Sequence, residues 1–428
     1  MDVNGTFSLE RQDQTFHDGL SRRGFLRGMM IGGIGAATLG ASPSAMARAL
    51  LSGKTAADIQ GAGVAKGIVR LNQNENPLGP SPKAVEAITK HLHELNRYVD
   101  DFSVIMNLYM RLNMMNGVRF DDLNLQNPAR EDMQKAQERN RVFLSDGSAN
   151  ILRAVTLTYL QDGGEVIEAE GGYGDVSEFA MILKQRGRDV TVTRVPLTAE
   201  KRHDLEAMRK AITPQTKLVV ITNPNNPTGT IVSHDELERF VNSVPETVKI
   251  LVDEAYIHFV KDPAYKNAAD LALSRPNVLV SRTFSKVYGL PGLRVGYALG
   301  MPKDFQLFWV FTGSVTQNLL CLHGALAALD DVEHVRRSQQ TIWDAREYLS
   351  KELKAMNLSY TPTESNFMVI EVKNPQAVVE QLAKQKVLIR DAERRWGVKG
   401  HIRVSVGTME ENEVFINALR QALAQVGA

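Results

Sequence analysis

The chain has 428 residues, with 50 lysines and arginines against 49 aspartates and glutamates, which gives a net charge of +1. This balance argues against a nucleic-acid-binding protein and against a polybasic membrane anchor, since both usually carry an excess of basic residues. The single cysteine, Cys321, excludes an intramolecular disulfide and a metal site built from cysteines. The length is sufficient for two or three domains, each with its own hydrophobic core.

The N-terminal residues have the three parts of an export signal in order. Arg22 and Arg23 are followed by an uncharged, glycine-rich run over 28–40 and by Ala45-Met46-Ala47, a small-residue cleavage site. The apolar run is too short to span a membrane, which needs about 20 residues. The arginine pair resembles a twin-arginine signal, which implies export of the folded protein to the periplasm. We therefore predict a removable signal peptide over 1–47; an amphipathic N-terminal helix is the alternative.

An N-terminal arm over 48–80 precedes a predicted large domain over 81–311, in which strand and helix patterns alternate. Alternation of this kind predicts an α/β fold with a mostly parallel sheet covered by helices on both faces. In such sheets ligands bind at the carboxyl ends of the strands. The predicted strands are 141–144, 165–169, 191–195, 217–222, 249–252 and 278–283, and the clearest predicted helices are 148–160 and 234–244.

The pattern changes after about residue 311, where a long helical stretch with polar breaks continues to about residue 356. Short predicted strands then alternate with helices, at 367–372, 387–390 and 402–406, and a helix over 410–425 closes the chain. These elements predict a smaller α/β domain over 312–428. Residues 100–140 show no clear strand.

The most informative motif is Ser281–Tyr297, which begins at the end of a predicted strand. Lys286 can form a Schiff base with an aldehyde. Thr283, Ser285 and Arg294 can bind a phosphate through charge-assisted hydrogen bonds. A lysine and a phosphate-binding set at this spacing suit pyridoxal 5'-phosphate as the cofactor.

Three more motifs follow predicted strands: Ser145–Asn150, Asn223–Gly229 and Asp253–Tyr256. Taken singly, each has an ordinary structural explanation, as a helix N-cap, a turn or a helix cap. An acidic residue at a buried strand end also needs a partner, because burial of an unpaired carboxylate is costly.

In this order, the motifs resemble those of the fold-type I pyridoxal-phosphate enzymes, specifically the class I/II aminotransferases and their histidinol-phosphate aminotransferase branch. The resemblance implies that Lys286, Asp253 and Tyr256 are catalytic. Asp253 would pair with the pyridine nitrogen, and Asn226 and Tyr256 with the phenolic oxygen. The implied phosphate contacts are Gly147, Ser148, Ala149, Thr283, Ser285 and Arg294. Tyr173 would stack on the cofactor ring, although the proline usual in that motif is missing.

Motifs outside the predicted sheet extend the resemblance from residue 69 to the C-terminus. In the family, the tyrosine matching Tyr98 reaches the cofactor of the neighbouring subunit, which implies a homodimer; a buried structural tyrosine is the alternative. Asn72 begins the segment Asn72–Pro82, which resembles the branch's N-terminal Asn-Glu-Asn-Pro motif, and is a predicted substrate contact. Arg403 and Arg390 would bind the substrate's carboxylate or phosphate. A surface salt bridge is the alternative for Arg390.

The sequence departs from the branch at three places. Leu78 and Val99 replace a usual tyrosine and a usual proline, and the segment 100–140 is longer than the norm. Its Met106, Met110 and Met114 have helical spacing, so we expect core or interface packing; a remodelled substrate pocket is the alternative. With export, these departures argue against the cytoplasmic step of histidine biosynthesis. The nine histidines suggest no defensible metal-ligand set.

We therefore predict an exported pyridoxal-phosphate-dependent aminotransferase that moves an amino group between an amino acid, or a related anionic amine, and a 2-oxo acid. Its partners are these small molecules, with no nucleic acid and no stable membrane insertion. The alternative is a decarboxylase or oxidase of the same fold, which could tailor an exported peptide or siderophore. A non-catalytic regulator is disfavoured, because the catalytic set is complete and an export signal precedes the fold.

Overall fold

The computed structural model describes residues 54–98, 102–124, 129–312 and 318–427. Lys54–Ala428 form one compact unit. The predicted signal peptide and Val99 lie outside the described residues. No helix in the described part of the chain is both long and apolar enough to cross a membrane.

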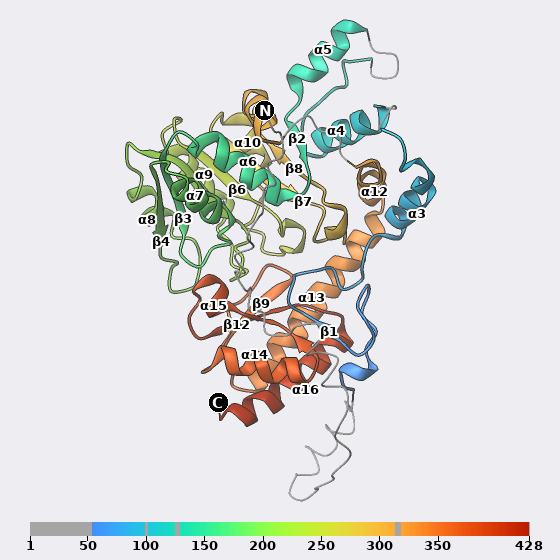
Figure 1. Ribbon diagram of the computed structural model, residues 1–428, viewed down its shortest axis with the longest axis vertical. Coiled ribbons are helices and arrows are strands. Elements are labelled where there is room, and N and C mark those ends of the chain that lie inside the picture. The colour runs from blue at the N-terminus through green and yellow to red at the C-terminus, as the bar shows by residue number, and fades with distance from the viewer. Residues whose placement is uncertain (1–53, 99–101, 125–128, 313–317, 428) are drawn as a thin grey trace, which may run out of the picture. The chain divides into compact units, whose positions relative to one another are not determined.

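A seven-stranded sheet organises the first two thirds of this unit (Figure 1). Its strand order is β2-β8-β7-β6-β5-β3-β4, and β8 alone runs opposite to the others. The mostly parallel α/β sheet that the sequence predicts is thus present, and the ends of its six predicted strands lie within one residue of the prediction; the seventh strand, β8, was not predicted. The strands are β2 (Val142–Ser145), β3 (Gly164–Ala169), β4 (Val190–Val195), β5 (Thr216–Thr222), β6 (Lys249–Asp253), β7 (Val278–Thr283) and β8 (Gly296–Leu299).

Both faces of this sheet are buried, because successive side chains of a strand point to opposite faces. In β5, Val219 and Ile221 belong to one apolar core, whereas Leu218 and Val220 belong to a second. Helices α6 (Ser148–Leu160), α7 (Asp175–Gln185) and α11 (Pro302–Thr312) cover the second core. The first core is covered by α8 (Leu205–Lys210), α9 (His234–Ser243), α10 (Ala269–Ser274) and the helices described next.

A second, antiparallel sheet has the order β11-β12-β9 and lies among the C-terminal helices. A separate parallel pair joins β1 (Val69–Arg70) to β10 (Val387–Leu388), so the start of the described chain lies beside its end. The other elements here are α12 (Leu319–Leu329), α13 (Val332–Ala355), β9 (Phe367–Glu371), α14 (Pro375–Lys384), β11 (Arg390–Asp391), α15 (Ala392–Trp396), β12 (His401–Ser405) and α16 (Met409–Val426).

The predicted single strand over 387–390 is wrong. Its first half, β10, pairs with β1, whereas its second half, β11, pairs with β12 in the other sheet. Ile389, between them, is buried and belongs to the first core. The chain therefore changes sheets at this residue while keeping its apolar side chain inside.

The long segment 100–140, which contains Met106, Met110 and Met114, includes two helices, α4 (Ser103–Met115) and α5 (Arg130–Arg139). The buried apolar side chains of α4 are Val104, Leu108 and Leu112, four residues apart. Met106 and Met114 are 48% and 55% exposed, so the predicted core role is wrong for these two. Their expected role at an interface stays a prediction.

The remaining helical elements are short and lie in the segments that precede or connect the strands and longer helices. They are η1 (Ala56–Asp58), α3 (Pro82–Lys90), η2 (Leu92–Glu94), η3 (Ile257–Phe259) and η4 (Pro291–Leu293).

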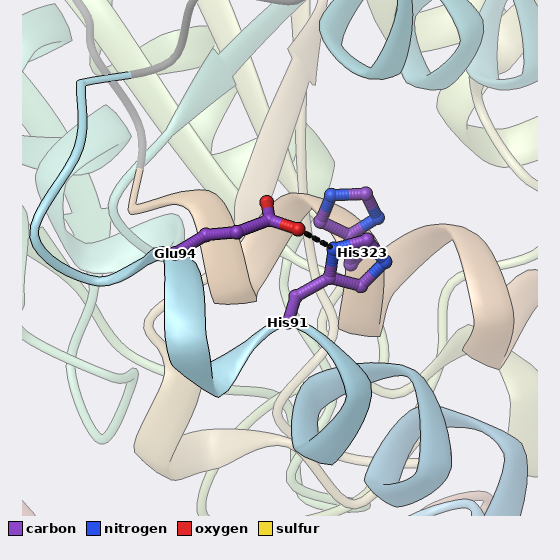
Figure 2. Close-up of side chains that lie close together, drawn as sticks. All are labelled: His91, Glu94 and His323. Carbon is purple, nitrogen blue, oxygen red and sulfur yellow. Dashed lines mark hydrogen bonds and ion pairs between the residues drawn. The ribbon is translucent and has the colours of Figure 1, made fainter.

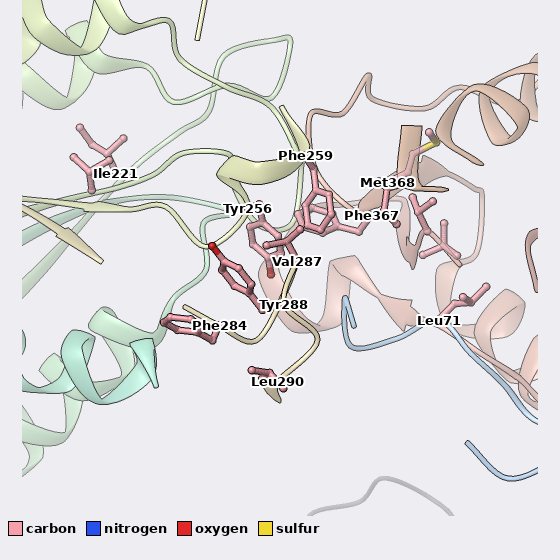
Figure 3. Packing of buried hydrophobic residues seen from close by; sticks show 14 of the residues in the cluster. Leu71, Ile221, Tyr256, Phe259, Phe284, Val287, Tyr288, Leu290, Phe367 and Met368 are labelled. Atoms are coloured by element: carbon pink, nitrogen blue, oxygen red, sulfur yellow. The ribbon is translucent and has the colours of Figure 1, made fainter. Parts of the chain in front are cut away.

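Aromatic side chains pack directly behind the carboxyl ends of the parallel strands (Figure 3). The ring of Tyr256, which follows β6, meets the ring of Phe367 from β9 edge-on, with centroids 4.9 Å apart. Phe284, after β7, packs on Tyr288 at 4.8 Å. The first core therefore joins the two sheets and fixes the loops that follow β6 and β7.

Candidate active site

A cavity of about 520 Å³ opens where β6 and β7 end, between these strands and the C-terminal sheet. This is the edge of a parallel sheet at which ligands are expected. Twelve of the residues singled out from the sequence form part of its wall: Ser148, Ala149, Tyr173, Asn226, Asp253, Tyr256, Thr283, Ser285, Lys286, Arg294, Arg390 and Arg403.

Lys286 lies three residues beyond β7, in the loop that the aromatic cluster fixes. Its Nζ donates a hydrogen bond to the Gln73 carbonyl oxygen at 3.2 Å and lies 5.5 Å from the centre of the Tyr256 ring. Burial, and next the positive charge of Arg403, lower the pKa of this amine to about 8. About a tenth of this amine is therefore neutral, and hence nucleophilic and basic, at pH 7.

Asp253 is the last residue of β6 and is only 4% exposed. Its Oδ1 has no hydrogen-bond partner among the described residues. Burial, and next the nearby Asp175 carboxylate, raise the pKa of Asp253 to about 7. A buried carboxylate without a partner is costly. The site thus fits a ligand that brings a positively charged or proton-bearing nitrogen to this oxygen.

The phenol of Tyr256 is held between two amides. The Nδ2 atoms of Asn74 and Asn226 donate to its Oη, at 3.0 and 3.4 Å. Burial raises the pKa of Tyr256 to about 12, so the phenol stays protonated and can also donate a hydrogen bond. The Asn226 Oδ1 accepts a bond from Arg403 Nη1 at 2.8 Å, which orients the amide of Asn226.

The opposite end of the cavity suits a phosphate. Gly147, the N-cap of α6, has φ of 83°, and a Cβ placed on it would collide with the Arg294 guanidinium. Backbone N–H groups at a helix N-terminus bind anions, and here the guanidinium lies against them. The Thr283 hydroxyl donates to the Ser285 hydroxyl at 2.9 Å, so both lie on the same side of the loop.

Arg403, from β12, forms the floor of the cavity near Lys286. Its guanidinium stacks on the Trp396 ring at 4.3 Å and donates through Nη2 to the Asn72 carbonyl oxygen at 2.9 Å. Arg390 Nε donates to that same oxygen at 3.4 Å, and the buried Arg403 Nε has no partner among the described residues. Burial, partly offset by Tyr256, lowers the pKa of Arg403 to about 10. Two guanidinium groups therefore converge on one point of the cavity.

Three predicted residues lie outside the cavity wall. Gly147 is directly behind Arg294, and Asn72 contributes its carbonyl oxygen, as described above. The Tyr98 side chain is 87% exposed to solvent, so the alternative of a buried structural tyrosine is wrong. Its expected contact with a neighbouring subunit stays a prediction.

The sequence prediction missed several residues of the wall. Asn74 lies inside the quoted Asn-Glu-Asn-Pro motif, so its position was a usable signal. Glu75 lies inside the same motif, and Arg70 and Gln73 precede it. Arg395 and Trp396 belong to the short helix α15, whose sequence carries no cofactor or substrate motif.

Comparison with known proteins agrees with this geometry. The sequence profile of the family described as aminotransferase class I and II matches residues 66–419. The histidinol-phosphate aminotransferase of Moorella thermoacetica is 34% identical over 374 residues, covering 87% of this chain and 90% of that protein. Histidinol-phosphate aminotransferase 2 of Pseudomonas fluorescens (strain Pf0-1) is 36% identical, covering 84% and 90%. The crystal structure of the Sinorhizobium meliloti histidinol-phosphate aminotransferase in complex with pyridoxal-5'-phosphate superposes with a TM-score of 0.71 at 23% identity, covering 91% and 96%.

The chain belongs to the class I and II aminotransferases and has the fold of the type I pyridoxal-phosphate enzymes. It is a pyridoxal 5'-phosphate-dependent aminotransferase of the histidinol-phosphate aminotransferase-like branch. The partnerless Asp253 oxygen and the cradle formed by Gly147 and Arg294 both fit this cofactor.

Proposed function

We propose that the protein transfers an amino group from an amine that carries an anionic group to a 2-oxo acid. The observation that carries this proposal is the pair of guanidinium groups, Arg403 and Arg390, which converge on the Asn72 carbonyl oxygen beside Lys286. A carboxylate or phosphate there would replace a neutral carbonyl as the hydrogen-bond acceptor of both arginines. Charge-assisted bonds of this kind are about twice as strong as neutral ones.

The chain's own residues then have separable tasks. When bound, pyridoxal phosphate supplies an aldehyde and an electron-withdrawing ring. Lys286 Nζ, with a pKa of about 8, takes and returns a proton in its neutral form at the substrate's amine-bearing carbon. Arg403 holds the substrate anion so that this carbon faces Nζ. Asp253 binds the ring nitrogen, and Tyr256 with Asn226 binds the phenolic oxygen.

Two more arginines at the cavity wall support a strongly anionic substrate. Arg70 pairs with Glu75 at 2.8 Å, and Arg395 pairs with Glu178 at 2.9 Å. Exposed ion pairs of this kind are worth little, typically ~0–1 kcal/mol, so either arginine can exchange its partner for a substrate anion at small cost.

The experiment is a panel of amines screened by the absorbance of the bound cofactor, which changes when the amino group is transferred to it. We expect conversion by amines with a carboxylate or phosphate, and none by their uncharged analogues. Arg403→Lys should raise KM for the amine by about tenfold or more, since it removes the two-pronged contact. Lys286→Ala is the matched control that should lose all conversion.

Two results would contradict the proposal. Equal conversion of charged and uncharged amines would show that the arginines do not select the substrate. Release of CO2 or H2O2 in step with amine consumption would instead identify the decarboxylase or oxidase chemistry expected from the same cofactor residues.

We also propose that the protein is exported through the twin-arginine route and acts as a periplasmic homodimer. Arg22 and Arg23, the apolar run and Ala45-Met46-Ala47 support export. The exposed Tyr98, with neighbouring exposed apolar residues Leu95 and Phe102, supports a subunit interface on this side of the chain.

Export has a direct test in the leader. Replacing Arg22 and Arg23 by lysine should leave the protein in the cytoplasm with its leader uncleaved, because the signal depends on the arginine pair. Cell fractionation and the mass of the purified chain measure this. Arg27→Lys, in the same leader, is the control and should be exported normally. Periplasmic protein from the double variant would refute this route.

A further inference from the structure

Three metal-ligating side chains meet at the surface, away from the cofactor cavity. They are His91, Glu94 and His323, whose donor atoms all lie within 4.8 Å of one another (Figure 2). His91 Nδ1 is 2.9 Å from Glu94 Oε1, and the two imidazole rings stack with their centres 3.5 Å apart. None of the three belongs to the wall of the cofactor cavity. The group therefore needs an explanation of its own.

The backbone holds these side chains together. His91 is the C-cap of α3, Glu94 ends η2, and His323 lies on α12. Next to His323 is Gly324, where an added Cβ would lie 2.8 Å from Leu293 and 3.0 Å from Ile88 of α3. The missing side chain at Gly324 thus allows α3 and α12 to approach closely. That approach brings His323 onto His91, 232 positions earlier in the chain, which no local spacing in the sequence could indicate.

The donor set has the composition of a transition-metal site. Two imidazole nitrogens and one carboxylate oxygen are ligands that Zn²⁺ prefers, at about 2.0–2.2 Å. Ligand atoms around a tetrahedral ion at these lengths are roughly 3.3–3.5 Å apart. Donor atoms up to 4.8 Å apart would have to close by about an ångström or more, and the stacked His91 and His323 rings would have to turn so that their in-plane lone pairs point to one ion. Both changes are rotations of side chains on a fixed backbone.

A fourth ligand is within reach. His93 Nε2 lies 3.6 Å from the same Glu94 oxygen, and the His93 side chain is 75% exposed. An exposed imidazole can change rotamer at little cost. His91, Glu94 and His323 are only partly buried, so an ion can enter from solvent.

We propose that His91, Glu94 and His323, with His93 as the fourth ligand, bind one divalent transition-metal ion of the Zn²⁺ type. The ion would tie α3 and η2 to α12. The set is the only such group of three among the residues that the structure describes.

The test uses the pyridoxal-phosphate-loaded protein, freed of any affinity tag and dialysed against a chelator. Titration with ZnCl₂ by calorimetry should give one ion per chain. Loss of an outer-shell partner typically costs about 10–100-fold in metal affinity, so loss of a direct ligand in His91→Gln or His323→Gln should cost at least that. Co²⁺ should give the visible absorption of a tetrahedral site, and this should vanish in the same variants.

The controls separate this site from other binding. His234 Nε2 lies 3.4 Å from an Asp270 carboxylate oxygen, but neither residue belongs to a group of three possible metal ligands among the described residues. His234→Gln should therefore bind Zn²⁺ like the wild type. Glu94→Gln, at a partly exposed position, gives a second variant if a histidine variant fails to fold, as judged by circular dichroism and cofactor absorbance. Absence of stoichiometric Zn²⁺ binding by the wild type, or unchanged affinity in His91→Gln, His323→Gln and Glu94→Gln, would overturn the proposal.

Discussion

Burial shifts the protonation equilibria of Lys286 and Asp253 in the same sense, toward the neutral form of each side chain. Water is removed from both groups, which disfavours the charged form of each. The pKa of Lys286 falls from an ordinary value of 10.5 to about 8, and that of Asp253 rises to about 7. At pH 7 the downward shift of Lys286 yields roughly several hundred times more neutral amine than a solvated lysine would have. The cavity thus prepares Lys286 as a base before any ligand enters, whereas a positively charged ring nitrogen would return Asp253 to its ionised form.

This shift predicts the pH dependence of cofactor uptake by the cofactor-free chain. Only the neutral Lys286 amine can attack the aldehyde, so the rate should rise with pH and level off above about pH 8. Arg403→Ala removes a positive charge that lowers this pKa, so the midpoint should move to higher pH and the rate at pH 7 should fall. Stopped-flow absorbance measures both.

Arg336, an exposed residue that pairs with Glu333, provides the control for that experiment. Arg336→Ala should leave the midpoint unchanged. A wild-type midpoint near 10, the value of a solvated lysine, would contradict the prediction.

At the level of single residues, the sequence predicts the cofactor side of the cavity better than the substrate side. Lys286, Asp253 and Asn226 follow recognisable strands and lie in the wall where expected. Arg395 and Trp396 come from a five-residue helix without a motif. Their position depends on how the C-terminal sheet packs, which is a long-range property that local sequence does not encode.

Among the elements, the N-terminus of α6 has the most direct effect on the site. Gly147 lets the helix begin against the Arg294 guanidinium, and a positive φ of 83° is easily adopted only by glycine. The first N–H groups of α6 and the guanidinium therefore face the same space.

Gly147→Ala should weaken cofactor binding by about tenfold or more, because a Cβ would displace the guanidinium, whose charge-assisted bonds are the strongest at this end of the cavity. Equilibrium titration with pyridoxal phosphate measures the loss. Gly174→Ala is the matched control: Gly174 is the N-cap of α7, has φ of 91° and would have no atom within 4 Å of the added Cβ. The Gly174→Ala variant should lose stability from backbone strain but keep its affinity for the cofactor. Equal losses of affinity in the two variants would contradict the role of Arg294.

Elements rich in β-branched residues were predictable to within a residue, since strands such as β5 and β7 are buried on both faces and read as continuous apolar runs. The prediction of one strand over 387–390 failed for a physical reason. Val387 and Leu388 pair with β1, Ile389 lies between the two strands, and Arg390 pairs with β12 in the other sheet; local hydrophobicity does not distinguish these partners.

On the scale of the whole molecule, a buried ion pair links distant parts of the structure. Arg282 of β7 donates through Nε and Nη2 to Glu254 Oε2, at 2.9 and 2.7 Å. Arg282 also bonds Asn116 at the end of α4, and Glu254 accepts from the Ala268 backbone N–H at 2.7 Å. Removal of one partner would leave a buried guanidinium without its counter-charge.

Glu254→Gln should therefore lower the free energy of unfolding by about 3–5 kcal/mol, the usual cost of breaking a buried pair from one side. Urea denaturation followed by circular dichroism measures it. Glu333→Gln breaks the exposed pair with Arg336 and should leave the unfolding midpoint unchanged. A similar, small effect in both variants would show that the Glu254 pair adds little.

The pairing of β1 with β10 also bears on when the site comes into being during synthesis. Val69 pairs with Val387, and the Asn74 N–H donates to the Ser405 hydroxyl at 2.8 Å. Ribosomes add roughly 5–20 residues per second, so Val69 waits about 15–60 s after its own synthesis for its partner to appear. Until then the Gln73 carbonyl and Asn74 amide cannot take their places against Lys286 and Tyr256. The cofactor cavity is therefore a property of the finished chain, and a nascent chain that lacks its last 40 residues cannot form it.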